Sequence, residues 1–181
     1  MRNRVLAWGS IAASIMITFG ALSVGAQTSA SGPYYAVPSW DQKLGVSTRF
    51  IVLSNWDGAA VLDRETGLVW ERSPSNVPAV WHEALTHCAN KTVGGRRGWR
   101  LPSFPELASL TDPSVPPGPV LPAGHPFTTV QSSIYWTATT SSTLTNGAWL
   151  VSLHSGALAS GFKGDPQLVF CVRGGMNADQ Y

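Results

Sequence analysis

The chain has 181 residues, of which 44% are hydrophobic, 10% are aromatic and only 12% are charged. Twelve lysines and arginines face ten aspartates and glutamates, and without Arg2 and Arg4, which precede an apolar run, 12 − 2 = 10 basic residues balance the 10 acidic ones. This balance argues against a nucleic-acid-binding protein, which normally carries a clear basic excess.

The N-terminal segment has the pattern of a secretory signal peptide. The basic start MRNR precedes an apolar run over residues 5–24, and the fairly small side chains of Val24 and Ala26 occupy the −3 and −1 positions of an expected cleavage site. The run is long for a signal peptide, so an uncleaved membrane anchor is the alternative. Because glycine and serine interrupt the run, we predict a signal peptide over residues 1–26. The mature protein is then secreted, periplasmic or at the cell surface.

The next segment, residues 27–48, carries two prolines and no hydrophobic period, which predicts an extended N-terminal arm. We expect one domain over residues 49–175 and a tail over residues 176–181, because a mature chain of this size suits a single core. The aromatic residues of the arm either pack onto the domain or stay exposed to stack on a ligand. They are Tyr34, Tyr35 and Trp40.

The first half of the domain predicts strands and then a helix. Apolar runs over residues 49–53 and 59–63 flank the turn residues SNWDG, and a hairpin loop over residues 64–67 ends in glycine. Further on, apolar side chains recur at the helical spacing i, i+3, i+4 and i+7, with Ser75 or Asn76 available as the cap. These apolar residues are Trp81, Ala84, Leu85 and Cys88.

A second short helix is predicted from Phe104 to a point before Pro113. Ser103 and Glu106 have the spacing of a capping box. The following residues, 112–128, include six prolines and predict a long loop, a kind of segment that often carries function. Four apolar runs separated by turn residues then predict antiparallel strands up to residue 173. The fold class is therefore α+β, with antiparallel strands, two short helices and a long irregular loop.

Cys88 and Cys171 are the only cysteines. Export favours disulfides, and two cysteines allow one pairing, so we expect a Cys88–Cys171 bond. Closing a loop of this length stabilises the fold by about 4 kcal/mol in the chain-entropy model. Two buried free thiols are the alternative.

Five motifs together resemble a known family. In order they are DRETGLVWER, WHEALTHC, GWRLPSFPEL, YWTATT and FCVRGG, and they resemble the C-terminal domain of a bacterial collagen-like adhesin, the Lcl C-terminal domain, from about Phe50 to Gly175. That family is similar to C-type-lectin-like domains, in which a first-helix cysteine pairs with one in the last strand. The resemblance implies a C-type-lectin-like fold and an extracellular binding module involved in adhesion. The adhesin domain is associated with sulfated polysaccharides.

The sequence departs from calcium-dependent lectins and from metalloenzymes. Asp112 is the only carboxylate between Thr111 and Gly164, whereas calcium takes six to eight oxygen ligands, mostly from carboxylates. His82 and His87 are five residues apart, one more than the zinc-protease helix requires. We therefore expect no metal, no cofactor and no enzymatic activity.

Basic and aromatic residues supply the candidate binding site. Arg96 and Arg97 lie in a glycine-flanked turn, and with Lys91 they form a possible anion-binding patch, because arginine forks suit sulfate and carboxylate. Trp56, in the SNWDG turn, is a candidate for exposed stacking. In the alternative, the turn is merely solvated and the aromatic residues pack. Structural roles are expected for Trp99, Arg100, Ser103 and Glu106, with Arg100 bonded to carbonyls or a carboxylate.

Two function classes follow. The first is a secreted recognition module that binds an extracellular glycan, such as a sulfated polysaccharide, or a protein through the long loop and the nearby surface. The second is a structural or assembly subunit of a bacterial envelope complex, in which the same surfaces hold a fixed partner. Nucleic acid is not an expected partner, and no membrane span is expected after cleavage.

Overall fold

The computed structural model describes residues 44–174. The predicted signal peptide, the aromatic residues of the arm and the tail lie outside the described residues. Within residues 44–174, no helix is long and apolar enough to cross a membrane. In chain order the elements are α1 (Val46–Arg49), β1 (Phe50–Val52), η1 (Ser54–Trp56), β2 (Ala60–Asp63), β3 (Val69–Glu71), β4 (Ser75–Ala79), α2 (Trp81–Asn90), β5 (Trp99–Arg100), α3 (Phe104–Ala108), β6 (Ile134–Thr140), β7 (Gly147–Ser152), β8 (Leu158–Phe162), β9 (Gln167–Val169) and β10 (Val172–Arg173).

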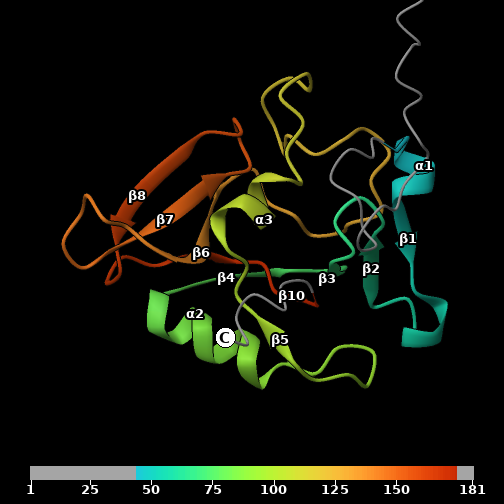
Figure 1. Cartoon of the computed structure of the whole chain (residues 1–181), viewed down its shortest axis with the longest axis horizontal. Helices are drawn as coiled ribbons and strands as arrows, with labels where there is room; N and C mark the ends of the chain where they lie inside the picture. The colour runs from blue at the N-terminus through green and yellow to red at the C-terminus, as the bar shows by residue number, and fades with distance from the viewer. Residues whose placement is uncertain (1–43, 175–181) are drawn as a thin grey trace, which may run out of the picture. The chain divides into compact units, whose positions relative to one another are not determined.

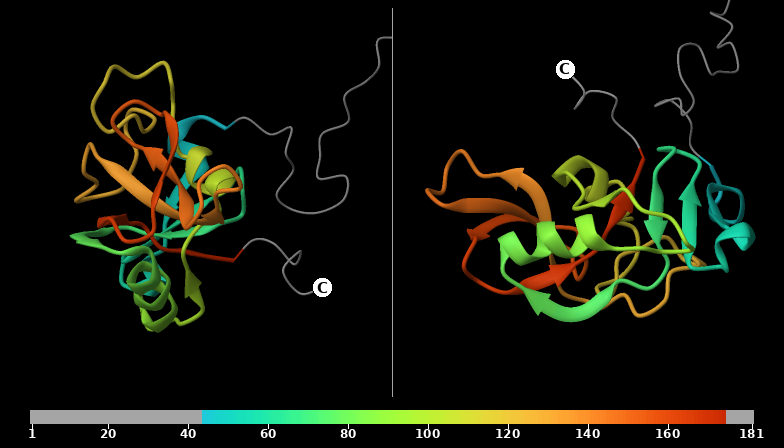
Figure 2. Two further views of the ribbon diagram at one scale, coloured as in Figure 1. Left: turned by 90° about the vertical axis from the view of Figure 1, so that its left-hand side faces the viewer. Right: turned by 90° about the horizontal axis from the view of Figure 1, so that it is seen from below.

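The strands form two five-stranded sheets. The first sheet has the order β1-β2-β3-β10-β5, and the second has the order β4-β9-β6-β7-β8. In Figure 1 the strands β6 to β8 lie on the left, the strands β1 to β3 on the right, and α2 and α3 below and above β6. Seen from below, α2 crosses in front of the C-terminal strands (Figure 2). The domain is thus α+β, as predicted.

Two clusters of buried apolar residues fill the space around the sheets. Tyr135 belongs to the cluster that includes Leu107 of α3, whereas its neighbour Trp136 belongs to the cluster that includes Ala84 and Cys88 of α2. Successive side chains of a strand point to opposite faces, so β6 is covered by a helix on each face. The predicted helical face of α2 is confirmed, since Ala84 and Cys88 are fully buried.

The segment over residues 168–173 joins the two sheets. It was expected to be one antiparallel strand, but β9 belongs to the second sheet, where it pairs in parallel with β6, and β10 belongs to the first. Between them lie Phe170 and Cys171, both fully buried. The disulfide joins Cys171 to Cys88 of α2, with 5.5 Å between their Cα atoms. It therefore fastens α2 to the crossing point between the sheets.

Some of the local elements predicted from the sequence are confirmed, and others are wrong. The hairpin between β2 and β3 is confirmed, and its loop closes with the Gly67 amide donating to the Asp63 carbonyl at 2.7 Å. The capping box of α3 is also confirmed. In contrast, residues 75–79 form the edge strand β4 and do not cap α2, whose N-cap is Val80. Residues 46–49 form one helical turn, which includes the last three residues of the expected extended arm and the first residue of the expected domain.

Candidate functional site

Trp56 lies under the loop that connects α2 to β5. Gly94 of that loop has a φ of +55°, and a Cβ at this position would lie 2.5 Å from the Cβ of Trp56, so the close approach requires glycine. The Trp56 ring meets Trp99 edge to face, with 6.3 Å between the ring centroids. Only 9% of Trp56 is exposed. The expectation of an exposed stacking surface at Trp56 is therefore wrong, because the loop packs against its backbone and Cβ and Trp99 packs against its ring.

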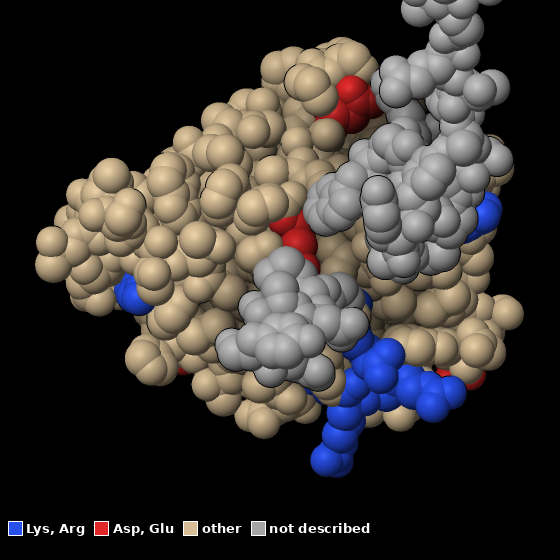
Figure 3. Space-filling model, in the orientation of Figure 1, with Lys and Arg blue, Asp and Glu red and all other residues tan. Residues whose placement is uncertain are grey.

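Arginine side chains surround the same tryptophan. The guanidinium carbons of Arg96 and Arg173 lie 5.6 Å and 5.4 Å from the centroid of the Trp56 ring. Arg173 also donates from Nε to the Arg97 carbonyl at 2.7 Å, which holds the turn against β10. We call Arg96, Arg97 and Arg173 the basic cluster. Figure 3 shows lysine and arginine side chains gathered at the lower edge of this face, near the loop before β5.

The basic cluster has no carboxylate partner among residues 44–174. Arg96 and Arg97 are exposed, as the glycine-flanked turn predicted. Their backbone is nevertheless ordered, because Val93 and Arg96 exchange backbone hydrogen bonds and the Arg96 carbonyl accepts from Trp99 Nε1 at 2.8 Å. Arg96 and Arg97 are thereby presented on an ordered turn, and Arg173 of β10 lies beside it. Sequence reasoning missed Arg173, although it lies within the FCVRGG motif.

Lys91 is not a member of the cluster. It forms an ion pair with Glu71, which is only 1% exposed. Burial raises the pKa of Glu71 above its ordinary value, although Lys91 and the Cys171 amide act in the opposite direction. The Lys91 Nζ also lies 3.3 Å from His87 Nε2, and partial burial together with the Lys91 charge lowers the pKa of His87. Lys91 thus neutralises a buried carboxylate, which corrects its assignment to an exposed anion-binding patch.

Arg100 and its neighbours maintain the fold. Arg100 binds both carboxylate oxygens of Glu106, at 2.8 Å and 2.6 Å, and donates to the Gly174 carbonyl at 2.9 Å. Glu106 in turn accepts from the Ser103 amide at 2.8 Å. Burial alone would raise the pKa of Glu106, but the hydrogen bonds from Arg100 and Ser103 outweigh it and lower that pKa. Trp99 is only 2% exposed, so the four residues form the structural unit that the sequence predicted.

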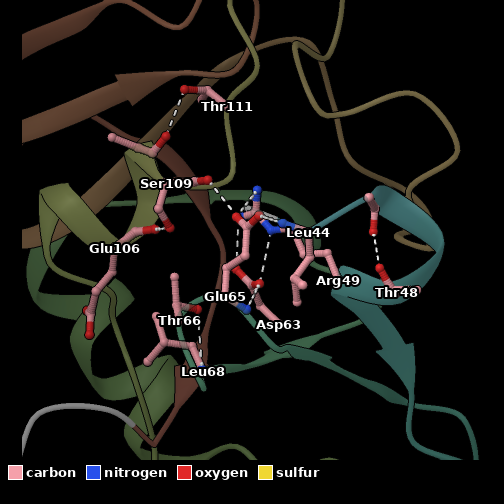
Figure 4. Close-up of polar contacts among 12 residues, drawn as sticks. Leu44, Thr48, Arg49, Asp63, Glu65, Thr66, Leu68, Glu106, Ser109 and Thr111 are labelled. Atoms are coloured by element: carbon pink, nitrogen blue, oxygen red, sulfur yellow. Dashed lines mark hydrogen bonds and ion pairs between the residues drawn. The ribbon is translucent and has the colours of Figure 1, made fainter. Parts of the chain in front are cut away.

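A second network of ion pairs lies beside α1. Arg49 binds both oxygens of the fully buried Asp63, at 3.0 Å and 2.9 Å, and contacts Glu65 at 2.9 Å. The same guanidinium donates to the Ser109 carbonyl at 2.8 Å, and Figure 4 shows these groups converging from α1, the β2–β3 hairpin and the segment after α3. Each charged group of the network contacts one of opposite sign, with two carboxylates sharing one guanidinium, so the network serves the fold.

A pocket of about 330 Å³ lies beside the loop that carries the basic cluster. Its lining includes Arg72 and Ser73 after β3, the Glu71–Lys91 ion pair, and Thr128 at the end of the long loop. The long loop itself is partly structural, since Leu121 and Phe127 belong to the core. It therefore borders the site but does not present a free surface along its whole length.

In the part of the chain that the structure describes, no group of three or more histidine, cysteine, aspartate or glutamate side chains could hold a metal ion. His82 and His87 are both exposed on α2 and lie outside the basic cluster. The arrangement offers fixed positive charge and hydrogen-bond donors, which are the chemistry of anion recognition.

The family model for the Lcl C-terminal domain matches residues 59–173, which is more than half of the chain. The chain belongs to this family. No curated protein matches it.

Proposed function

We propose that this domain is a secreted, non-enzymatic recognition module with a C-type-lectin-like fold, and that it binds an acidic glycan at the bacterial surface. The basic cluster carries the proposal. Arginine makes bidentate contacts with sulfate and carboxylate, and guanidinium groups already fixed beside Trp56 lose little further freedom on binding. The resemblance to an adhesin domain associated with sulfated polysaccharides supports the same class of ligand.

The test is retention on heparin-agarose. The variant carrying Arg96→Ala and Arg97→Ala is expected to elute at lower salt than the parent, because contacts between exposed charges are screened by ions. Its melting temperature should stay nearly unchanged, since exposed charges contribute only about 0 to 1 kcal/mol to folding. Arg64→Ala, at an exposed arginine of the β2–β3 loop, is the matched control and should elute with the parent. Equal elution of the double variant and the parent would contradict the proposal.

One observation favours the second function, a subunit of an envelope assembly. The edge strand β8 carries no charged residue, and Leu158 and Phe162 are 45% and 54% exposed. An uncharged edge strand with exposed apolar side chains is suited to pairing with another protein. Co-purification of one envelope protein with the parent, lost in Phe162→Asp but kept in the double arginine variant, would favour this function over glycan binding.

A further inference from the structure

Arg72 is a partly buried basic residue of the pocket wall that has no carboxylate partner among the described residues, a property it shares with Arg173 and Lys163. Its side chain is half-buried, and its guanidinium donates from Nε to the Pro126 carbonyl at 3.0 Å and from Nη1 to the Gly58 carbonyl at 3.3 Å. Arg49, Lys91 and Arg100 each have a carboxylate partner. Arg72 has none among residues 44–174. A partly desolvated charge is costly without a counter-ion, so this position favours an anion.

The backbone around Arg72 holds this guanidinium in place. The Arg72 amide donates to the Ala59 carbonyl at 2.9 Å, and its carbonyl accepts from the Thr128 amide at 2.8 Å. Three segments of the chain thus meet at this residue, and the two side-chain bonds fix the direction of the guanidinium. Its remaining terminal nitrogen, Nη2, has no partner within the described part of the chain. A prearranged donor of this kind binds an oxyanion without first having to be ordered.

The pocket beside Arg72 has the size and charge for one small acidic group. Arg72 and Lys91 supply two positive charges and Glu71 one negative charge, which leaves a net charge of 2 − 1 = +1. Ser73 and Thr128 add hydroxyl groups to the wall, where the two hydroxyls are hydrogen-bonded to each other. The volume of about 330 Å³ lies at the lower end of the range for small-molecule pockets, which is roughly 300 to 1,000 Å³. A monoanion on a small polar body, such as one sugar unit, matches these features.

We propose that this pocket binds a single oxyanion group, a carboxylate or a sulfate ester, carried by one sugar unit of an acidic glycan. Arg72 Nη2 is the principal donor, and the pocket hydroxyls contact the sugar. Val93 of the pocket wall pairs with Arg96, and Gly58 follows Trp56 by two residues, so the same loops carry the pocket and the basic cluster. The inference rests on the proposed function in one respect: it assumes that neighbouring sugar units of the glycan bound in the pocket contact the basic cluster.

The pocket is tested with small probes that are too short to need the cluster. The amide signals of the ¹⁵N-labelled protein are followed while sodium glucuronate, glucose 6-sulfate or the neutral methyl ester of glucuronate is added. Saturable shifts are expected at residues 58–59, 72–73 and 128 with an anionic probe and not with the neutral ester. Response to glucuronate alone identifies a carboxylate site, and response to glucose 6-sulfate alone identifies a sulfate site. Absence of saturable shifts at these residues with both anions overturns the proposal.

Two variants separate the pocket from simple attraction of charges. Arg72→Lys keeps the positive charge but loses the fork, and it should weaken binding of the anionic probe about tenfold or more, as expected for one lost charge-assisted hydrogen bond. Ser73→Leu leaves Arg72 intact and narrows the pocket, so it should abolish binding. The substitution also removes the exposed hydrogen bond between the Ser73 and Thr128 hydroxyls, so the melting temperature should fall only slightly. Arg64→Lys is the matched control and should bind like the parent. Unchanged binding in Ser73→Leu overturns the proposal even if Arg72→Lys fails to fold.

The same measurements distinguish the pocket from the basic cluster. In the variant with Arg96→Ala and Arg97→Ala, the glucuronate shifts at residues 58–59 and 72–73 should persist, while heparin retention falls. If the probe shifts only residues 94–98 and 173 in the parent, the pocket proposal fails and the proposed function stands. If the probe binds at the pocket but the double variant keeps full heparin retention, the proposed function fails and the pocket stands.

Discussion

The two sheets differ in how they are stabilised. The strands of the second sheet contain no charged residue, whereas those of the first contain Asp63, Glu71, Arg100 and Arg173. The ion pairs Arg49–Asp63, Lys91–Glu71 and Arg100–Glu106 each include a residue from the first sheet. The second sheet is held instead by apolar side chains such as Trp136 and Leu150. The ion pairs of the described residues are therefore concentrated around the first sheet.

This difference explains where the candidate sites lie. A buried ion pair fixes geometry at a desolvation cost, and removal of one partner leaves an uncompensated charge. In a region where most charges are matched, the unmatched arginines of the basic cluster and of the pocket stand out. The strands of the second sheet have no such contrast, because their polar side chains are uncharged. Substitutions in the two sheets should accordingly destabilise the domain by different mechanisms.

The largest effect is expected in the first sheet, for Asp63→Ala. The change leaves Arg49, which is 8% exposed, without its bidentate partner. Breaking a buried pair typically costs about 3 to 5 kcal/mol, and Glu65 still compensates part of the charge, so we expect the free energy of unfolding to fall by about 3 to 4 kcal/mol. Urea unfolding at pH 7 measures it. Arg64→Ala, at an exposed neighbour, should change it by less than about 1 kcal/mol. Equal losses in the two variants would contradict an electrostatic role.

A loss of similar or slightly smaller size is expected in the second sheet, for Leu150→Ala. Leu150 is 4% exposed, and truncation of a buried leucine costs about 2 to 5 kcal/mol; we expect about 3 kcal/mol. Gly161 of β8 lies directly against it, because a Cβ there would be 2.7 Å from Leu150 Cδ1. Gly161→Ala alone should therefore be destabilising through overpacking.

The double variant tests whether packing is the mechanism in the second sheet. With Leu150→Ala present, the added methyl group of Gly161→Ala enters the vacated space. The double variant should then be more stable than the sum of the single losses predicts, by about 1 kcal/mol or more. Thermal and urea unfolding of the four proteins complete the cycle. Additive losses would mean that the two residues do not share a packing site.

The sequence predicted local elements better than the way the two sheets are joined. The hairpin loop before Gly67 and the capping box at Ser103 were readable because each depends on side chains within a few residues. The division of residues 168–173 between two sheets depends on pairing with strands far away in the chain. The alternation of hydrophobic residues along a strand does not indicate which strands pair with it. Pro78 is tolerated in β4 because that strand lies at the edge of its sheet, where a missing backbone N–H does not interrupt the pairing. The position of β4 at the edge cannot be predicted from the sequence.

The candidate site was predicted in part for the same reason. Exposure of Arg96 and Arg97 follows from their glycine-flanked turn, and the bond from Arg100 to Glu106 follows from a separation of six residues around the capping box. Lys91 could not be assigned to Glu71 from the sequence, because the two are 20 positions apart, with β4 and α2 between them. Arg173 and Trp56 meet only through the pairing of β10 with its neighbours. The sequence identifies the basic residues that could bind an anion. Only the structure shows which of them already form an ion pair with a carboxylate of the domain.

The smallest expected effect is a pH-dependent change in the free energy of unfolding that depends on Glu106. Bonds from Arg100 and Ser103 outweigh the effect of burial and lower the pKa of Glu106 in the folded state. A carboxylate with a lowered folded pKa contributes stability that is fully present above its unfolded pKa, about 4.3, and is lost as the pH falls through the folded value. The difference in unfolding free energy between the parent and Glu106→Gln should therefore be largest near pH 7 and should shrink below about pH 4.

Urea unfolding of the parent and Glu106→Gln between pH 7 and pH 3 measures that difference. Glu83→Gln removes an exposed carboxylate from α2 and is the matched control for the loss of one negative charge. At neutral pH, Glu106→Gln should cost more than Glu83→Gln, because Arg100 then faces a neutral partner across a partly buried contact. If the gap between the parent and Glu106→Gln stays constant from pH 7 to pH 3, the Arg100–Glu106 pair does not stabilise the fold through its charge. The contrast between an electrostatically held first sheet and an apolar second sheet would then rest on Arg49 and Lys91 alone.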